Sequence, residues 1–398
     1  MTLKVIVSGA GIAGLALSHW LGRIGASTVL IERAPRFEAL GHYISLKGNG
    51  VEMARRMGIL AACQARAVPI EEVYFYTAAK RLLRKERTAA LAKTLGGYIL
   101  FRRADLQAAL YELVRERADI RFGTQIEEVR TAADGVEVRL SDGRTGRGDL
   151  LVGADGVHSR VRGLVFGEGF ERPLGGHYIA ISQTLRHGLR AVAHSYLGIG
   201  SMVNLLPVAP DSVSAVVYVG ANAEPPPHDD PLAMRDYLLA TCAGFPEEVV
   251  RVLGNIGAND FVFSDAINQV EMPRITQGRC AVIGDAAHCP TLLSGMGSSL
   301  ALQDAHILAG CLARNPDDFT TSLARYEELM TPIARRYRDS AVRAHGTFLT
   351  SSRIKARLRD LALRFVPNRL FERGIRRFYD AERPLPDLPA QGAGTPRR

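Results

Sequence analysis

The sequence predicts an α/β fold in which a mostly parallel sheet is interleaved with an antiparallel sheet and followed by C-terminal helices. Three observations predict it. Residues 4–32 alternate strand, glycine-rich turn, helix and strand; residues 176–219 form a block of short strands; and residues 320–380 have a helical pattern. At 398 residues the chain exceeds the usual size of a single hydrophobic core, so we expect two coupled domains.

The first stretch has an order typical of a dinucleotide site. An apolar run, Lys4–Ser8, leads into Gly9-Ala10-Gly11-Ile12-Ala13-Gly14 and a helical segment, and a second apolar run ends in Glu32 and Arg33. Gly9 permits a tight turn, Gly11 lets a pyrophosphate approach the backbone, and Gly14 lets the helix pack closely on the sheet.

The helix that follows the turn would offer free N–H groups to phosphates, and Glu32 can accept hydrogen bonds from ribose hydroxyls. The order therefore predicts binding of a dinucleotide with an ADP half. It does not distinguish a nicotinamide cofactor from a flavin cofactor, because both carry an ADP half.

The composition and charge bear on whether the protein binds nucleic acid or spans a membrane. The formal net charge is +9, with 47% hydrophobic and 23% charged residues, as in an ordinary globular protein. This charge suits anionic cofactors and substrates, and we expect no nucleic-acid partner. No apolar run reaches the ~18 residues of a membrane span, and a strand beginning at residue 3 leaves no room for a signal peptide.

The cysteines are few and scattered. None forms a Cys-x-x-Cys pair, so we expect neither a redox disulfide nor a metal site, and we expect a reducing, cytoplasmic location. They are Cys63, Cys242, Cys280, Cys289 and Cys311.

The segment after Arg33 is rich in glycine and polar residues. Residues 41–50 are either a plain loop or a crossover that contacts a cofactor, in which case Lys47 would meet phosphate or flavin. A helix is expected at 51–57. Arg103 lies at the start of a helix that is expected to run to residue 117, where it is either a surface arginine or a functional one. Short strands are expected at 72–76, 81–84, 120–122, 125–131 and 135–140.

A second motif follows an apolar strand at 150–153. Gly153-Ala154-Asp155-Gly156 leads into a basic helical segment, so Asp155 either caps that helix or approaches a ligand. Strands are then expected at 177–184, 192–197, 202–207, 213–219 and 261–263, and helices at 231–242 and 247–253.

A third motif lies late in the chain. A buried-type strand at 279–283 runs into Gly284-Asp285-Ala286-Ala287-His288, then Gly295-Met296-Gly297-Ser298-Ser299, and a helix at 300–312. A strand that ends in Gly-Asp puts a carboxylate at the carboxyl edge of the sheet, where ligands of such folds bind. Asp285 can bind a polyol hydroxyl, and the N–H groups of the glycine-rich turn can bind a ring oxygen.

The C-terminal part is expected to be helical, with breaks at Pro332 and Pro367, and it is basic between Arg353 and Arg377. These helices are either solvated and packed on the domain, or they contact a membrane surface or a partner. The residues after Arg383 are rich in Pro and Gly and are expected to fray.

Together, the three motifs and Arg103 resemble the class A, p-hydroxybenzoate hydroxylase-like, FAD-dependent aromatic monooxygenases over roughly residues 3–350, and the tetracycline-inactivating monooxygenases look like relatives. The resemblance implies a Rossmann-like FAD-binding domain of the GR2 type, and with it an assignment of domains. The FAD domain would comprise 1–71, 97–172 and 273–340, the substrate domain 72–96 and 173–272, and a helical tail 341–398.

The resemblance also implies roles for residues. Gly9, Gly11 and Gly14, with Ile12 and Ala13, would hold the ADP moiety, and Glu32 its ribose. Arg103 would contact the FAD phosphate or ribityl region, Asp155 belongs to a motif tied to FAD and NAD(P)H, and Asp285 after Gly284 would bind the ribityl chain. Residues Gly295, Gly297, Ser298 and Ser299 would place backbone N–H groups at the pyrimidine edge of the flavin.

Two positions depart from the family pattern. The family commonly has Pro where this chain has Leu292, with Pro at 290 instead, and Gly-Gln-Gly-x-Asn where this chain has Met296 and Ser299. Backbone donors survive these changes, so flavin binding is still expected.

The resemblance implies a reaction in which NAD(P)H reduces FAD and the reduced flavin captures O2 as a C4a-hydroperoxide. The hydroperoxide would then hydroxylate an aromatic or polycyclic small molecule. The absence of a second Gly-x-Gly-x-x-Gly segment argues against a separate nicotinamide domain. Alternatives are an FAD-dependent reductase or dehydrogenase of the same fold, or a flavin-binding protein without turnover. A monomer or dimer is expected.

No catalytic side chain is assigned from the sequence. The candidates for a base by position alone are His42, Tyr43, His177, Tyr178, His194, Tyr196 and Tyr218.

Overall fold

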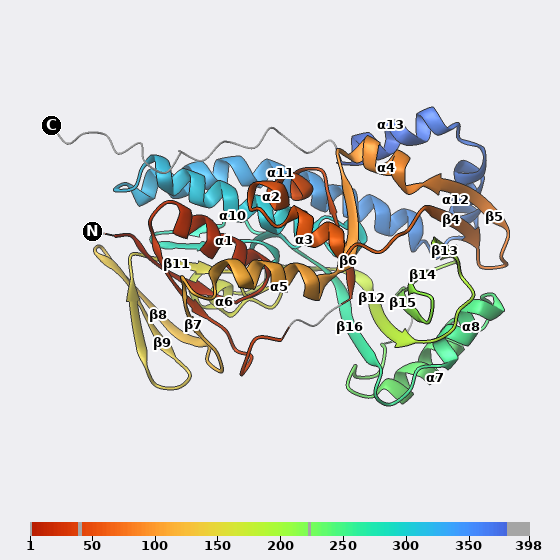
Figure 1. Ribbon diagram of the computed structural model, residues 1–398, viewed down its shortest axis with the longest axis horizontal. Coiled ribbons are helices and arrows are strands. Elements are labelled where there is room, and N and C mark those ends of the chain that lie inside the picture. The colour runs from red at the N-terminus through yellow and green to blue at the C-terminus, as the bar shows by residue number, and fades with distance from the viewer. Residues whose placement is uncertain (1, 39–41, 222–223, 380–398) are drawn as a thin grey trace.

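A computed structural model describes residues 2–38, 42–221 and 224–379 (Figure 1). Its first layer is a six-stranded sheet with the strand order β17-β18-β11-β1-β2-β7. Four neighbouring pairs are parallel, and the short edge strand β17 is antiparallel. The strands are β1 (Lys4–Ser8), β2 (Ser27–Ile31), β7 (Asp119–Arg121), β11 (Leu150–Gly153), β17 (Thr276–Gln277) and β18 (Cys280–Val282).

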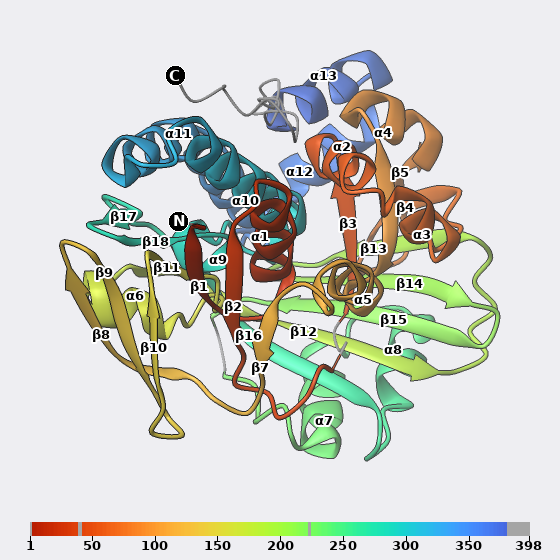
Figure 2. The same cartoon turned by 60° about the vertical axis from the view of Figure 1, so that its left-hand side comes forward.

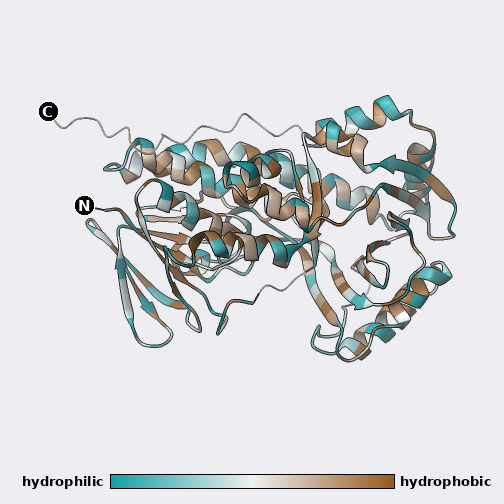
Figure 3. Ribbon diagram, in the orientation of Figure 1, coloured by the Kyte–Doolittle hydropathy of each residue, from teal (hydrophilic) through white to brown (hydrophobic). Residues whose placement is uncertain are grey.

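Helices pack on this sheet because the contact removes their apolar faces from water. Helix α1 (Ile12–Arg23) contacts α5 (Arg103–Val114) and α10 (Gly297–Arg314), and α10 contacts α11 (Phe319–Phe348). Trp20 of α1 is buried in the shared core. In Figure 3, α11 alternates hydrophilic and hydrophobic residues along its length, as helices with one buried face do. Helix α10 is buried on all sides from Ser299 to Leu312.

Smaller elements surround this layer. A three-stranded sheet contains β8 (Ile126–Ala132), β9 (Gly135–Leu140) and β10 (Thr145–Gly148), and α6 (Arg160–Phe166) follows β11. The turn after β18 forms α9 (Asp285–His288) and the 3-10 turn η1 (Leu292–Ser294).

The second layer is a seven-stranded sheet with the order β16-β12-β15-β14-β13-β4-β5, antiparallel except for the β13–β4 pair. Figure 2 shows β12, β15 and β14 side by side. The strands are β4 (Glu72–Thr77), β5 (Leu82–Arg87), β12 (Glu171–Thr184), β13 (Val192–Leu197), β14 (Ser201–Ala209), β15 (Ser212–Val219) and β16 (Phe261–Val270).

The two faces of this sheet bury different partners, because successive side chains of a strand point to opposite faces. Ile179, Ile181 and Val217 pack under α7 (Pro231–Thr241) and α8 (Glu247–Gly254). Tyr178 and Tyr218, one residue away on the same strands, join the opposite cluster, with side chains of η1. The second face of the sheet is therefore turned toward the third motif.

The structure corrects one of the two alternatives for residues 41–50, the plain loop. From Tyr43 to Lys47 the chain is a strand, β3, paired with β6 (Tyr98–Arg102), and residue 41 lies outside the described residues. The strand was missed because β3 has only five residues and is followed directly by glycines. Helices α2 (Asn49–Arg56), α3 (Leu60–Ala65) and α4 (Thr88–Leu95) complete this region.

The predicted break at Pro332 is wrong, because α11 runs through it from Phe319 to Phe348. Met330, Ile333 and Ala334 are buried beside the proline. A mid-helix proline costs about 3 kcal/mol, and packing of this face offsets that cost. The break at Pro367 is confirmed, since it separates α12 (Arg353–Phe365) from α13 (Asn368–Tyr379).

The C-terminal helices are tied to β5 by the buried side chain of Arg84. Its Nη1 donates to the carbonyl of Val366 at 2.9 Å, and its Nη2 donates to the Asn368 side chain at 2.8 Å. Glu86 pairs with the same guanidinium, which also lies over the ring of Phe371. In both cartoon views α13 lies beside α4 (Figure 1 and Figure 2).

The other predicted strands and helices are confirmed within a few residues, apart from β12 and β16, which are both longer than expected. No helix among the described residues has the length and hydropathy to cross a bilayer. The domain boundaries inferred from the sequence remain a prediction.

Candidate functional site

The three sequence motifs meet because their strands are neighbours. β1, β11 and β18 lie side by side and parallel, and each motif begins where its strand ends. The carboxyl ends of parallel strands meet at the same edge of a sheet, which is where α/β proteins bind ligands. Turns that are far apart in the sequence therefore form one site.

Glycines allow these turns to touch. A Cβ added to Gly9, whose φ is +102°, would lie 2.6 Å from the carbonyl oxygen of Ala154. A Cβ at Gly14 would lie 1.9 Å from the carbonyl oxygen of Gly9, and one at Gly284 would lie 2.9 Å from the Cβ of Ala13. The first motif thus packs directly against the second and the third.

Gly11 differs from its neighbours because open space lies in front of it. Its backbone is extended, with φ −78° and ψ −171°, and the nearest atom to an added Cβ is Nη2 of Arg103, at 4.0 Å. Gly11 caps α1, so the free N–H groups of that helix and the Arg103 guanidinium face the same space. Both favour an anion there.

Arg103 is held by α5 and by the first turn. Its Nη1 donates to Oε1 of Gln107 at 3.3 Å, and Nε2 of Gln107 donates to the carbonyl of Ala10 at 3.1 Å. Its own N–H donates to the carbonyl of His42 at 2.9 Å.

Glu32 stabilises the glycine turn. Its two carboxylate oxygens accept hydrogen bonds from the N–H groups of Ala10, at 2.8 Å, and Ala34, at 2.9 Å. Arg33, next in the chain, is exposed. The role of Glu32 toward a ribose, and that of Arg33 as a cofactor-binding residue, remain predictions.

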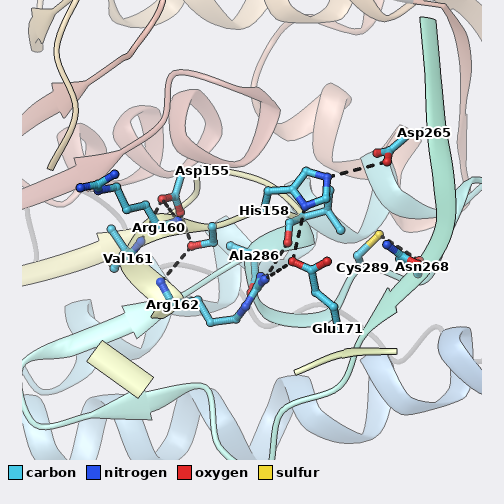
Figure 4. Close-up of polar contacts among 12 residues, drawn as sticks. Asp155, His158, Arg160, Val161, Arg162, Glu171, Asp265, Asn268, Ala286 and Cys289 are labelled. Carbon is cyan, nitrogen blue, oxygen red and sulfur yellow. Dashed lines mark hydrogen bonds and ion pairs between the residues drawn. The ribbon is translucent and has the colours of Figure 1, made fainter. Parts of the chain in front are cut away.

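Asp155 has the hydrogen bonds of a helix cap, which is one of the two alternatives that the sequence left open. Figure 4 shows its carboxylate at the start of α6, where it accepts from the Ser159 hydroxyl at 2.5 Å and from the N–H of Arg160 at 2.9 Å. Ser159 in turn accepts from the N–H of Arg162 at 3.0 Å. The side chain of Asp155 thus fixes the direction of α6.

The third motif brings Asp285 to the first turn of α10. A Cβ added to Gly297 would lie 3.6 Å from Oδ1 of Asp285. The Asp285 side chain is exposed, yet the surrounding protein raises the pKa of its carboxyl by desolvation, while Arg103 and His288 act in the opposite direction. An accessible carboxylate so closely surrounded by protein is suited to a hydroxyl-bearing ligand.

Lys47 connects β3 to the same turn. Its ammonium donates to the carbonyl of Gly295 at 3.2 Å, and its backbone N–H donates to the hydroxyl of Ser299 at 3.1 Å. Ser299 is buried and its hydroxyl serves this contact, whereas Ser298 is half-buried. The N–H groups of Gly297 and Ser298 lie in the first helical turn, where they have no intrahelical partner.

A buried network behind Asp285 was missed from the sequence. Asp304 accepts from the N–H of Gly284 at 2.5 Å and from the hydroxyl of Tyr326 at 2.6 Å, and its carboxylate lies 2.7 Å from Nε2 of His288. Burial and the carboxylate raise the pKa of Tyr326 well above its usual range. The available signal was a lone acid within the apolar run 300–312.

Aromatic side chains lie on the other side of the site. The ring of His42 is 6.3 Å from that of Tyr178 and 6.5 Å from that of Phe263. Burial raises the pKa of Tyr178, and the nearby Asp265, Cys289 and Asp285 add to that effect. Tyr178 of β12 is thus close to the third motif.

The burial of His42 leads us to expect that the stability of the protein depends on pH. Burial, with a contribution from Arg103, lowers its pKa from 6.5 to about 4. Because the folded state favours the neutral ring, its contribution is complete above pH 6.5 and declines as the pH falls toward 4. We expect His42→Phe to reduce the stability lost between about pH 7 and 5 by about 2 kcal/mol, measured by urea unfolding of the FAD-free protein.

His187→Phe is the control for this experiment, since the His187 side chain bonds to the carbonyl of Ala209 at 2.7 Å, away from Arg103. An unchanged pH dependence in His42→Phe would show that His42 is not held neutral by the fold.

Comparisons with known proteins agree with this geometry. A family model described as "FAD binding domain" matches residues 2–187 and 264–341. A flavin-dependent monooxygenase from an unknown prokaryotic organism is 31% identical over 361 residues, which cover 89% of this chain and 92% of the relative. The aurachin C monooxygenase/isomerase of Stigmatella aurantiaca is 30% identical, over 84% of this chain and 87% of its own.

A solved structure is also similar. The tetracycline destructase Tet(55) superposes with a TM-score of 0.80 and 28% identity, over 97% of this chain and 99% of its own. The matched ranges include all three motifs of the site and the strands that carry them, β1, β11 and β18. The chain belongs to the family of class A FAD-dependent aromatic monooxygenases.

Proposed function

We propose that this FAD-dependent monooxygenase hydroxylates an aromatic or polycyclic small molecule, using O2 and NAD(P)H. One observation carries the choice of substrate class: the residues suited to FAD face aromatic side chains at the edge of the seven-stranded sheet. His42, Tyr178 and Phe263 are mutually within ring-contact distance there. Flat apolar ligands pack well against such rings.

The geometry of the site fits FAD. The space at Gly11, bordered by Arg103, suits the pyrophosphate, because a side chain there would fill it. Asp285 is suited to the ribityl hydroxyls, and the N–H groups of Gly297 and Ser298 to the pyrimidine edge of the ring. Bound FAD, once reduced by NAD(P)H, would supply the chemistry that activates O2.

The protein's own part is binding, orientation and exclusion of water. Asp304 holds Gly284 and so fixes the backbone that carries Asp285. Lys47 holds the carbonyl of Gly295 and so fixes the turn that leads into α10. The cluster of Tyr178, Tyr218 and Leu292 gives the substrate side an apolar wall.

We expect Phe263→Ala to lower kcat/KM for the aromatic substrate about tenfold while FAD affinity stays unchanged, because an aromatic contact contributes about 1 kcal/mol beyond its buried area. Steady-state kinetics and a flavin titration check this. Phe245→Ala is the control, since Phe245 packs on the face of the sheet under α7 and α8. An equal loss of kcat/KM in both variants would place the substrate elsewhere.

The function itself is tested with the purified, FAD-loaded protein and a panel of polycyclic and aromatic compounds. Tetracycline and aurachin C enter the panel because similar proteins are named for them. A substrate is expected to increase NAD(P)H oxidation and to give a product with one added oxygen atom derived from O2. NAD(P)H oxidation that reduces an added acceptor, with no oxygenated product from any compound, would favour a reductase of the same fold.

A further inference from the structure

Helix α12 carries an exposed apolar stripe that no part of the proposed reaction uses. Its four members recur at spacings of four, three and four residues, which places them on one face of the helix. Their side chains remain largely accessible: Ile354 is 72% exposed, Leu358 60%, Leu361 51% and Phe365 67%. Large apolar side chains gathered on one face mark a contact surface, whereas isolated ones do not.

Cations flank this stripe. Arg353, Arg357 and Arg364 lie along one side of it and Lys355 along the other, and all four are exposed. The acid of this helix, Asp360, lies 2.9 Å from the guanidinium of Arg359, which is buried. α13 adds exposed Arg369, Arg373 and Arg376 to the same end of the molecule.

The stripe is held in place by the body of the protein. Nη1 of Arg359 donates to the carbonyls of Gly198, at 3.1 Å, and Phe348, at 3.2 Å, so the opposite face of α12 is anchored to the seven-stranded sheet and to α11. Arg84 fixes the C-terminal end of the helix. The apolar face is therefore presented as a preformed surface.

We propose that this stripe and its flanking cations dock the enzyme on an anionic phospholipid bilayer, with α12 lying in the plane of the interface. An apolar face at the depth of the acyl chains, between rows of Arg and Lys at the level of the headgroups, is the arrangement of interfacial helices. Each cation near an anionic leaflet adds to the attraction. Arg353 and Arg357 also line a cavity of about 490 Å³ beside α12, which gives phosphate headgroups room next to the stripe.

Charge favours an anionic bilayer on this stripe over a second copy of the protein and over the chain's own C-terminal segment. A second copy docked through the same stripe would bring identical rows of cations together, which is repulsive. The chain after Tyr379 has three acidic and three basic residues, and its large apolar side chains are Leu385 and Leu388. That segment offers neither net negative charge nor an apolar face comparable to the stripe.

The test is co-sedimentation of the full-length protein with vesicles of phosphatidylcholine, either pure or mixed with phosphatidylglycerol in equal parts. We expect binding to the mixed vesicles alone, weakened by added salt. The double variant Leu358→Ser/Phe365→Ser is expected to bind them about tenfold less well, and Arg357→Glu/Arg364→Glu to lose binding by at least as much. Thermal unfolding checks that each variant is folded.

The matched control is Leu164→Ser/Leu232→Ser, which removes two large apolar side chains that are 41% and 42% exposed on α6 and α7. The proposal is overturned if the wild type does not bind anionic vesicles, or if the control loses binding equally. It is also overturned if light scattering finds a dimer that Leu358→Ser/Phe365→Ser dissociates, or if binding appears only after deletion of residues 380–398.

Discussion

Gly14→Ala is expected to destabilise the protein by more than about 4 kcal/mol, enough to prevent folding at 37 °C. The added Cβ would lie 1.9 Å from the carbonyl oxygen of Gly9, which is backbone and cannot rotate away. Gly9 itself is fixed between the N-terminus of α1 and Ala154 of the second motif. Relief would therefore require α1 to move off the sheet, and soluble expression and urea unfolding measure the result.

Gly22→Ala is the matched control for this substitution. Gly22 lies in the same helix, and an added Cβ would have no neighbour within 4 Å. Because alanine restricts the unfolded chain and favours helix, this variant is expected to gain about 0.5–1 kcal/mol. If Gly14→Ala were as stable as Gly22→Ala, the close contact between α1 and the turn would be wrong.

Gly11→Val is expected to abolish FAD binding, raising the dissociation constant at least about a hundredfold, while the protein still folds. The backbone of Gly11 is extended, so valine fits it, and the nearest atom to the new Cβ is 4.0 Å away. Its two methyl groups would fill the space that we assign to the pyrophosphate. A flavin fluorescence titration measures the loss.

The FAD-free form of Gly11→Val is the internal control, since its free energy of unfolding is expected to stay within about 1 kcal/mol of the wild type. A stable Gly11→Val protein that binds FAD as tightly as the wild type would show that the phosphates lie elsewhere. A protein that fails to fold would contradict the open space in front of Gly11.

Much of this site could be predicted from local sequence. The first motif was accessible because strand, turn and helix follow each other within the first 32 residues, and each glycine there has a steric reason. The third motif was accessible for the same reason, since Gly284 and Asp285 end a strand. Their contact, through the Cβ of Ala13, depends on the neighbouring positions of β1, β11 and β18, which no local pattern specifies.

The features that could not be predicted from local sequence depend on contacts between residues far apart in the chain. Asp155 fits the patterns of both a cap and a ligand, and its hydrogen bonds as a cap depend on where α6 lies. β3 could not be distinguished from a loop until β6, about 50 residues later, was seen to pair with it. The helix through Pro332 likewise depends on packing around it.

A crystal structure of the FAD complex tests the central claim most directly, namely that three motifs form one FAD site. We expect the pyrophosphate at the N-terminus of α1 between Gly11 and Arg103, and the ribityl chain on the carboxylate of Asp285. The pyrimidine edge of the flavin is expected at the N–H groups of Gly297 and Ser298. FAD bound with its ribityl chain out of reach of Asp285, or with its phosphates away from Gly11, would contradict the account.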